Sequence, residues 1–299
     1  MTEMKIITAK SCLEYGSPGH PEAPARIAQT QQLLERQGFE FSPAASCTEH
    51  DILRVHTHEH LEAVRTRKFH DPDTPNLPGM FDHAKRAAGA AIQAAELALH
   101  GEPAFSLMRP PGHHACRDRL MGFCYFNNIA IAVASVLEAG TKPKAHDYEH
   151  GLPVKRVAIL DFDCHHGNGT EDIFYGHPNV LFVSLHQHPC YPGTGVHPEK
   201  NCINYPLPPA TGEKEFLAAL DDALVKIAAF EPNALAVSAG FDAHKKDPIT
   251  QMDLQTGTFE QIARRIAALK LPTFSVLEGG YSQDLPECVA AYLRGLIAP

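Results

Sequence analysis

Short apolar runs alternate along this chain with longer stretches in which apolar residues recur every three or four positions. The short runs have the length and composition of buried strands, and they cover residues 5–8, 104–108, 156–160, 180–185, 235–238 and 273–277. The longer stretches have the period of amphipathic helices, and they cover residues 84–99, 128–139, 213–230, 254–269 and 286–297. This alternation is typical of an α/β fold, in which helices cover both faces of a mainly parallel sheet.

No internal repeat or long linker divides this pattern. Residues 72–78, which include three prolines, and the charged residues 140–153 predict irregular surface loops rather than domain boundaries. A chain of 299 residues is long for one domain but lies within the range of a single large α/β unit. We therefore expect one domain that spans residues 1–299.

Charge and composition exclude several function classes. The formal net charge is −9 and lysines and arginines form no run, which argues against nucleic-acid binding. A negative surface favours cationic ligands. No window approaches 18 consecutive apolar residues, and residues 1–10 lack the pattern of a signal peptide. The eight cysteines are scattered without a C-x-x-C pair, as is usual for reduced thiols, so we expect a cytoplasmic protein with no membrane partner.

Polar or glycine-flanked residues directly follow four of the predicted strands and close a fifth, 180–185. These residues form the segments 109–114, 161–168, 184–186, 239–242 and 278–281. The carboxyl ends of parallel strands lie at one edge of a sheet, and ligands collect there. We therefore expect the five segments to converge on one site.

The segment after the third strand carries the chemistry of a metal site. Alternate side chains of an extended backbone share a face, so Asp161, Asp163 and His165 can point the same way. Asp163 and His165 offer an oxygen and an imidazole nitrogen to one ion, a combination that suits zinc. A lone D-x-H is more often a solvated loop, but the four other polar segments favour a metal site here.

Five sequence blocks resemble the signatures of the zinc-dependent histone deacetylase family. The blocks are R-P-P-G-H-H-A, G-F-C-Y-F-N-N, L-D-F-D-C-H-H-G-N-G-T, S-A-G-F-D-A-H and E-G-G-Y. The pattern is most similar to the class II and bacterial acetylpolyamine amidohydrolase branches, and it extends from about residue 19 to residue 295. The resemblance implies one three-layer arginase/deacetylase-like catalytic domain. It also implies a zinc-dependent amidohydrolase that removes acetyl or related short acyl groups from N-acetyl-lysine side chains with metal-activated water.

The resemblance assigns metal and catalytic roles to particular residues. It implies that zinc, or ferrous iron in the cell, is bound by Asp163, His165 and Asp242. The catalytic residues that it implies are an acid–base pair of histidines, their hydrogen-bond partners and a tyrosine that donates to the scissile carbonyl; these are His113, His114, Asp161, Asn168 and Tyr281. For Asp242, the alternative role is a helix cap after a glycine turn.

The resemblance also implies a substrate tunnel and a potassium site. The tunnel walls would be Phe123 and Tyr191, with Gly112 and Gly122 leaving room beside them. Two further substrate positions are the tunnel-mouth residue, where polyamine-specific relatives carry glutamate, and the arginine of an internal acetate channel; these are Ile249 and Arg26. Structural K⁺ would be held by Asp161, Asp163, His165, Ser184 and Leu185, partly through carbonyl oxygens. A second potassium site would involve Phe174 and Val180, although His177 and Asn201 depart from the family pattern there.

Several alternatives stay open at the level of sequence. An acylated polyamine is a second substrate class beside an acylated lysine peptide or protein. An arginase-like binuclear manganese hydrolase is less favoured, because it would need additional bridging carboxylates and His165, His166 and Asn168 fit a mononuclear site better. A non-catalytic acyl-lysine or polyamine-binding protein is less favoured because the histidine pair and the tyrosine are both present. The alternate histidines of residues 56–60 could chelate a second metal on a strand, but we expect this segment to open a helix, where i and i+2 diverge. The physiological substrate, the acyl length and the oligomeric state are open.

Overall fold

A computed structural model describes residues 4–141 and 154–298 of the 299-residue chain. Its centre is one eight-stranded sheet with the strand order β2-β1-β3-β8-β7-β4-β5-β6, and every adjacent pair is parallel. The strands are β1 (Lys5–Thr8), β2 (Glu40–Pro43), β3 (Ala104–Ser106), β4 (Val157–Asp161), β5 (Val180–Gln187), β6 (Cys202–Leu207), β7 (Ala234–Ala239) and β8 (Thr273–Leu277).

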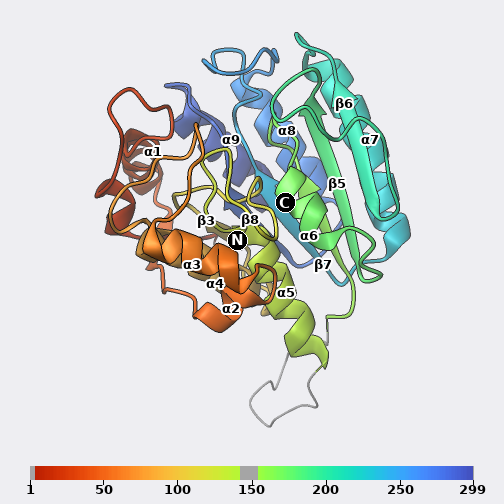
Figure 1. Cartoon of the computed structure of the whole chain (residues 1–299). Coiled ribbons are helices and arrows are strands. Elements are labelled where there is room, and N and C mark those ends of the chain that lie inside the picture. The colour runs from red at the N-terminus through yellow and green to blue at the C-terminus, as the bar shows by residue number, and fades with distance from the viewer. Residues whose placement is uncertain (1–3, 142–153, 299) are drawn as a thin grey trace.

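Helices form a layer on each side of this sheet (Figure 1). They are α1 (Ala25–Arg36), α2 (Glu49–Leu53), α3 (His58–Thr66), α4 (Met80–Leu99), α5 (Asn128–Thr141), α6 (Asn168–Phe174), α7 (Glu213–Phe230), α8 (Thr256–Ala267) and α9 (Leu285–Ile297), with a 3₁₀ turn η1 (Lys10–Leu13). In one layer α1, α9, α8 and α7 contact one another in series, and in the other α4 contacts α5, which contacts α6. The predicted three-layer fold with a mainly parallel sheet is therefore confirmed.

The six predicted strands and five predicted helices are all present, and the differences lie at the edges of the fold. The sequence analysis missed β2 and β6, which are the two edge strands and have partly exposed side chains. An edge strand pairs on one side only and needs no continuous apolar run, so its sequence signal is weak. The helices α1, α2 and α6 were also not predicted, whereas the helix expected to open at residues 56–60 is α3. The predicted loop at 140–153 begins inside α5, and its residues 142–153 lie outside the described residues.

The register of the sheet brings the candidate residues to one edge. Asp161, the last residue of β4, lies opposite Ser184 of β5 and Ser238 of β7. Ala239 of β7 lies opposite Leu277 of β8, so the segments that follow these strands leave the sheet side by side. Among the described residues no helix is both long enough and apolar enough to cross a membrane.

Candidate active site

Asp163, His165 and Asp242 form a buried cluster beyond the carboxyl ends of β4 and β7. One ligand atom from each residue lies within 4.8 Å of the others, and no other such group occurs in residues 4–141 and 154–298. His165 Nδ1 is 2.8 Å from Asp242 Oδ2 and 3.2 Å from Asp163 Oδ1. The structure thus brings together the three residues that the sequence analysis assigned to the metal.

The surroundings of the two carboxylates fit a divalent cation. Asp163 Oδ2 accepts a hydrogen bond from the Gly279 N–H at 2.7 Å, and Asp242 Oδ1 accepts one from the Cys164 N–H at 2.7 Å. The other oxygen of each carboxylate faces His165. Burial and the charge of Asp163 raise the pKa of Asp242 to about 6, as expected for two carboxylates that share a buried site. Two carboxylates and one imidazole leave a coordination position open, which fits a catalytic zinc site.

A glycine at position 279 allows the backbone of the β8 segment to reach this cluster. A Cβ atom added to Gly279 would lie 2.5 Å from both Asp163 Oδ2 and Asp242 Oδ2. Such a contact is too short for any side chain. The glycine is therefore required by the approach of the backbone to the two carboxylates.

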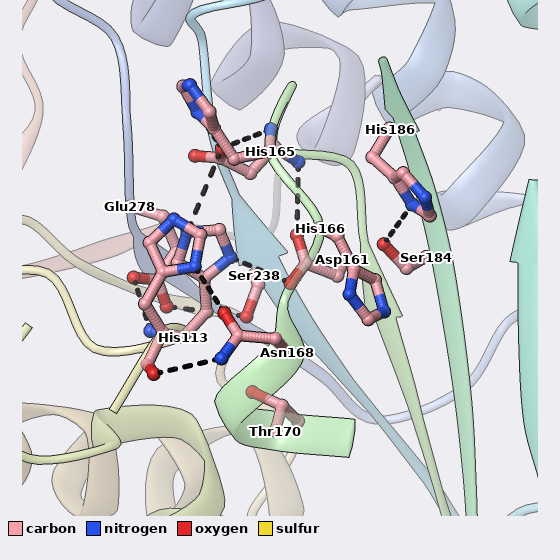
Figure 2. Close-up of polar contacts among 12 residues, drawn as sticks. His113, Asp161, His165, His166, Asn168, Thr170, Ser184, His186, Ser238 and Glu278 are labelled. Atoms are coloured by element: carbon pink, nitrogen blue, oxygen red, sulfur yellow. Dashed lines mark hydrogen bonds and ion pairs between the residues drawn. The ribbon is translucent and has the colours of Figure 1, made fainter. Parts of the chain in front are cut away.

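His113 and His114 lie beside the metal cluster with their ring centroids 4.1 Å apart. His113 Nδ1 is 3.0 Å from Asp161 Oδ2, and His114 Nδ1 is 2.7 Å from Asn168 Oδ1 (Figure 2). The Asn168 amide nitrogen faces Cys116 Sγ at 3.3 Å, so the amide oxygen is the atom that faces His114. Since this oxygen can only accept, His114 carries its proton on Nδ1 and leaves Nε2 with a lone pair.

The surroundings of His113 and His114 shift the pKa values of the two imidazoles in opposite directions. Burial alone would lower the pKa of His113, but the carboxylates of Asp163 and Asp161 raise it to about 10. Burial lowers the pKa of His114 well below its usual value, and the neighbouring His113 and His165 lower it further. His113 therefore favours the cation, whereas His114 favours the neutral ring that a general base requires.

The peptide unit between Gly280 and Tyr281 makes a hydrogen bond at each of its two polar atoms. The Tyr281 N–H donates to Asp247 Oδ2 at 2.7 Å, and the preceding Gly280 carbonyl accepts from Arg26 Nε at 2.7 Å. The Arg26 guanidinium also lies 4.7 Å from the centre of the Tyr281 ring. Burial raises the pKa of Tyr281 well above its usual value, so the phenol keeps its proton and can donate it in a hydrogen bond. Arg26 also donates to the carbonyl of Glu278, so its guanidinium bonds to two carbonyls of the segment that carries Tyr281.

Two aromatic rings flank the histidine pair and the tyrosine. Tyr191 contacts the His114 ring edge to face at 5.2 Å, and Phe123 contacts the Tyr281 ring in the same way at 5.8 Å. A Cβ on Gly122 would lie 2.5 Å from His114 Cδ2. Ile249 is exposed.

Gly112, which the resemblance assigned to the tunnel, packs against the backbone at the start of α5. A Cβ on Gly112 would lie 2.4 Å from the backbone nitrogen of Asn128. The absence of a side chain there allows the segment that carries the histidines to pack against the start of α5.

Glu278 belongs to the site, although the sequence analysis gave it no role. Its side chain is fully buried, and Oε2 accepts from the N–H groups of Gly112 at 2.7 Å and His113 at 3.2 Å. Ser238 Oγ donates to Oε1 at 3.3 Å (Figure 2). Glu278 follows β8 directly and Asp161 is the last residue of β4, so a search for acidic residues at the carboxyl ends of buried strands would have found both.

Three of the residues assigned to potassium, Asp161, Ser184 and Leu185, lie on the adjacent strands β4 and β5. Ser184 Oγ is 2.9 Å from His186 Nδ1, and Ser184 pairs in register with Asp161. At the second implied potassium position, the Asn201 side-chain amide donates to the carbonyls of Phe174 at 2.8 Å and Val180 at 2.9 Å. An amide group therefore occupies the acceptors that the resemblance assigned to a cation.

The histidines of residues 56–60 are structural. His58 begins α3 as expected for a helix start, and Thr57 caps that helix. His56 Nδ1 is 2.9 Å from the Cys116 carbonyl, and His60 Nε2 is 2.8 Å from the Tyr125 carbonyl. Both rings are buried and already bonded to the backbone, so they do not form a second metal site.

The chain is similar to known proteins both in sequence and in fold. Residues 20–296 match the model of the histone deacetylase domain. The chain is 40% identical to a probable deacetylase of Archaeoglobus fulgidus, over 90% of this chain and 78% of that protein. It is 41% identical to acetylpolyamine amidohydrolase 1 of Pseudomonas aeruginosa, over 72% of this chain and 61% of that protein. The crystal structure of an acetylpolyamine aminohydrolase from Burkholderia pseudomallei matches with a TM-score of 0.88 and 29% identity, over 99% of both chains.

Proposed function

This chain belongs to the histone deacetylase family and is a hydrolase of amide bonds, and from that premise we propose that it removes acetyl or related short acyl groups from the side-chain amine of N-acetyl-lysine. The observation that carries this proposal is the neutral His114, partnered by Asn168 and 5.9 Å from the His165 ring of the two-aspartate, one-histidine cluster, together with the protonated Tyr281 phenol. Residues 1–299 would act as one catalytic domain.

Asp163, His165 and Asp242 would hold the metal, with Zn²⁺ as the proposed ion and Fe²⁺ as the alternative that metal analysis distinguishes. When bound, such an ion polarises the amide carbonyl and lowers the pKa of a water molecule to roughly 7. Asp161, Ser184 and Leu185 would contribute, together with Asp163 and His165, to a structural potassium site.

The protein's own side chains would then carry the proton transfers. His114 Nε2 takes a proton from the attacking water while the water oxygen bonds to the carbonyl carbon. His113, ion-paired with Asp161, adds positive charge near the developing oxyanion. The Tyr281 hydroxyl donates a hydrogen bond to that oxygen. His114 returns the proton to the amine nitrogen as the C–N bond breaks, and the products are a carboxylic acid and an amine, which leave as a carboxylate and an ammonium ion.

The aromatic walls suit the methylene chain of the substrate. Phe123 and Tyr191 would pack against the four carbons between the amide and the rest of the molecule. A lysine side chain and an acetylated polyamine both present such an N-acyl aminoalkyl group. Gly112, Gly122 and Ile249 would complete the channel and its mouth.

Acetylpolyamine hydrolysis is the second candidate, and a specific observation favours it. Burial raises the pKa of Tyr191, and the negative charges of Asp71 and Asp73 raise it further, so this wall experiences a negative potential from the two carboxylates. A second ammonium group on the substrate would be attracted there. The name of the Pseudomonas aeruginosa relative points the same way.

The test is turnover of Tyr281→Phe together with its metal content. The variant keeps the ring but lacks the hydroxyl donor, so we expect kcat to fall on the order of 10²–10³-fold with the metal still bound. Unchanged turnover in metal-loaded protein would remove the mechanism. Acetyl-lysine peptides and acetylated polyamines, assayed in parallel on the unmodified enzyme, distinguish the two substrate classes.

A further inference from the structure

Asp247 is a buried carboxylate that joins two loops at the edge of the site. Its Oδ2 accepts the N–H of Tyr281 at 2.7 Å, and its Oδ1 accepts the N–H of Ile249 at 3.1 Å. The Asp247 N–H itself donates to the His244 carbonyl at 2.8 Å, which closes a turn. One side chain therefore links the catalytic tyrosine to the exposed residue at the proposed tunnel mouth.

This carboxylate has no cationic partner within the described part of the chain. Its neighbour Lys246 is exposed and pairs instead with Asp284 at 2.7 Å. Burial raises the pKa of Asp247 to about 7, and the charge of Asp242 contributes to the increase. A buried acid without a counter-charge destabilises a protein, so its presence favours a role other than stability.

The peptide unit between Gly280 and Tyr281 shows what that role is. Arg26 binds the carbonyl oxygen of this unit, and Asp247 binds its N–H. A peptide unit is planar, so hydrogen bonds at both of its polar atoms fix its rotation. The plane in turn sets the direction in which the Tyr281 side chain leaves the backbone. Gly280, at φ 118°, adopts a conformation that L side chains rarely reach and does not itself restrict the unit.

We propose that Asp247 is a positioning residue for the hydrolysis, which fixes the peptide unit of Tyr281 and couples the phenol to the tunnel-mouth residue Ile249. The proposal rests on the proposed function and deepens it. Asp247 acts through Tyr281, and within residues 4–141 and 154–298 its hydrogen bonds are to Tyr281, Ile249 and His244 and not to a metal ligand.

Asp247→Asn is the matched perturbation. An amide side chain keeps the shape but has only one acceptor oxygen, so one of the two N–H groups loses its partner. A small displacement of a catalytic group can reduce turnover by 10- to 100-fold, and we expect a kcat decrease on the order of 10-fold with KM nearly unchanged. Zinc content and Tm should stay close to those of the unmodified enzyme. Asp284→Asn, which removes a partly exposed carboxylate from the segment between Tyr281 and α9, serves as the control and should retain full turnover.

A double-mutant cycle with Tyr281→Phe separates positioning from a general structural effect. If Asp247 acts through the phenol, Asp247→Asn will change kcat by less than about twofold once the hydroxyl is absent. An equal loss in both backgrounds would overturn the proposal, as would full turnover of Asp247→Asn alone. Asp247→Ser, whose smaller side chain also lacks the second acceptor, provides a second variant with the same expected kcat loss and the same overturning outcome. Full turnover of Tyr281→Phe would instead refute the proposed function, so the two failures are distinguishable.

Discussion

Acid should destabilise this enzyme through His56, a buried histidine that bonds to the backbone of Cys116 and Asn127. His56 Nδ1 donates to the Cys116 carbonyl, and His56 Nε2 accepts the N–H of Asn127 at 2.9 Å. Since Nε2 must keep its lone pair to accept, the folded protein requires the neutral ring. Burial, with a smaller contribution from His60, lowers the pKa of His56 from 6.5 to about 3. Protonation would break the hydrogen bond from the Asn127 N–H, which ties His56 to the start of α5.

The magnitude follows from the difference between the folded and unfolded pKa values. The unfolded chain binds a proton at His56 below about pH 6.5, and the folded protein does so only near pH 3. The stabilisation is therefore complete above pH 6.5 and is lost as the pH falls from there toward 3, at about 1.4 kcal/mol per pH unit. At about pH 5 the loss from this group alone is about 2 kcal/mol.

The assay is urea unfolding of the unmodified protein and His56→Gln at about pH 7.5 and about pH 5. Glutamine offers one donor and one acceptor but does not titrate in this range. We expect the free energy of unfolding to fall by about 2 kcal/mol less in the variant than in the unmodified protein. Other histidines affect both proteins equally and cancel in the difference. An identical fall in both proteins would refute the assignment of a neutral, bonded His56.

Three further predictions concern the site itself. Asn168→Asp places a carboxylate on His114 Nδ1, which raises the pKa of His114 and should move the acidic limb of the kcat/KM profile to higher pH; an unmoved limb would contradict the partnership. Gly122→Ala adds a Cβ 2.5 Å from His114 Cδ2 at a positive φ of 57°, and steady-state assays should find kcat reduced at least on the order of 10-fold. Gly176→Ala is its control, because the φ of 75° gives similar backbone strain while the nearest contact is Lys200 Cδ at 3.5 Å; equal losses would exclude the clash as the cause. Chelation of the metal should abolish turnover and lower Tm, because the buried aspartates then repel each other, and added Zn²⁺ should restore both; a Tm that does not respond to the metal would argue against the site.

Local signals in the sequence determined the fold class and the candidate ligands. The central strands β4, β5 and β7 are buried on both faces, and such strands require continuous apolar runs that are visible without any partner. Asp163 and His165 were identified from their spacing on one face of an extended backbone together with the polar segments that follow the other predicted strands. The edge strands and the short helix α6 were missed because their stability comes from neighbours rather than from their own composition.

Only the tertiary structure decided how separate loops hold one another. Arg26 was assigned to an internal channel from sequence, yet it binds the carbonyls of Glu278 and Gly280, which lie 252 and 254 positions away. Asp247 carries no sequence signal for its role, because its partner Tyr281 lies 34 positions along the chain. Such contacts depend on the register of β7 beside β8 and on the lengths of the loops that follow them. A hydrogen bond forms only within a few tenths of an ångström of its preferred distance, and that precision arises when the whole sheet is assembled.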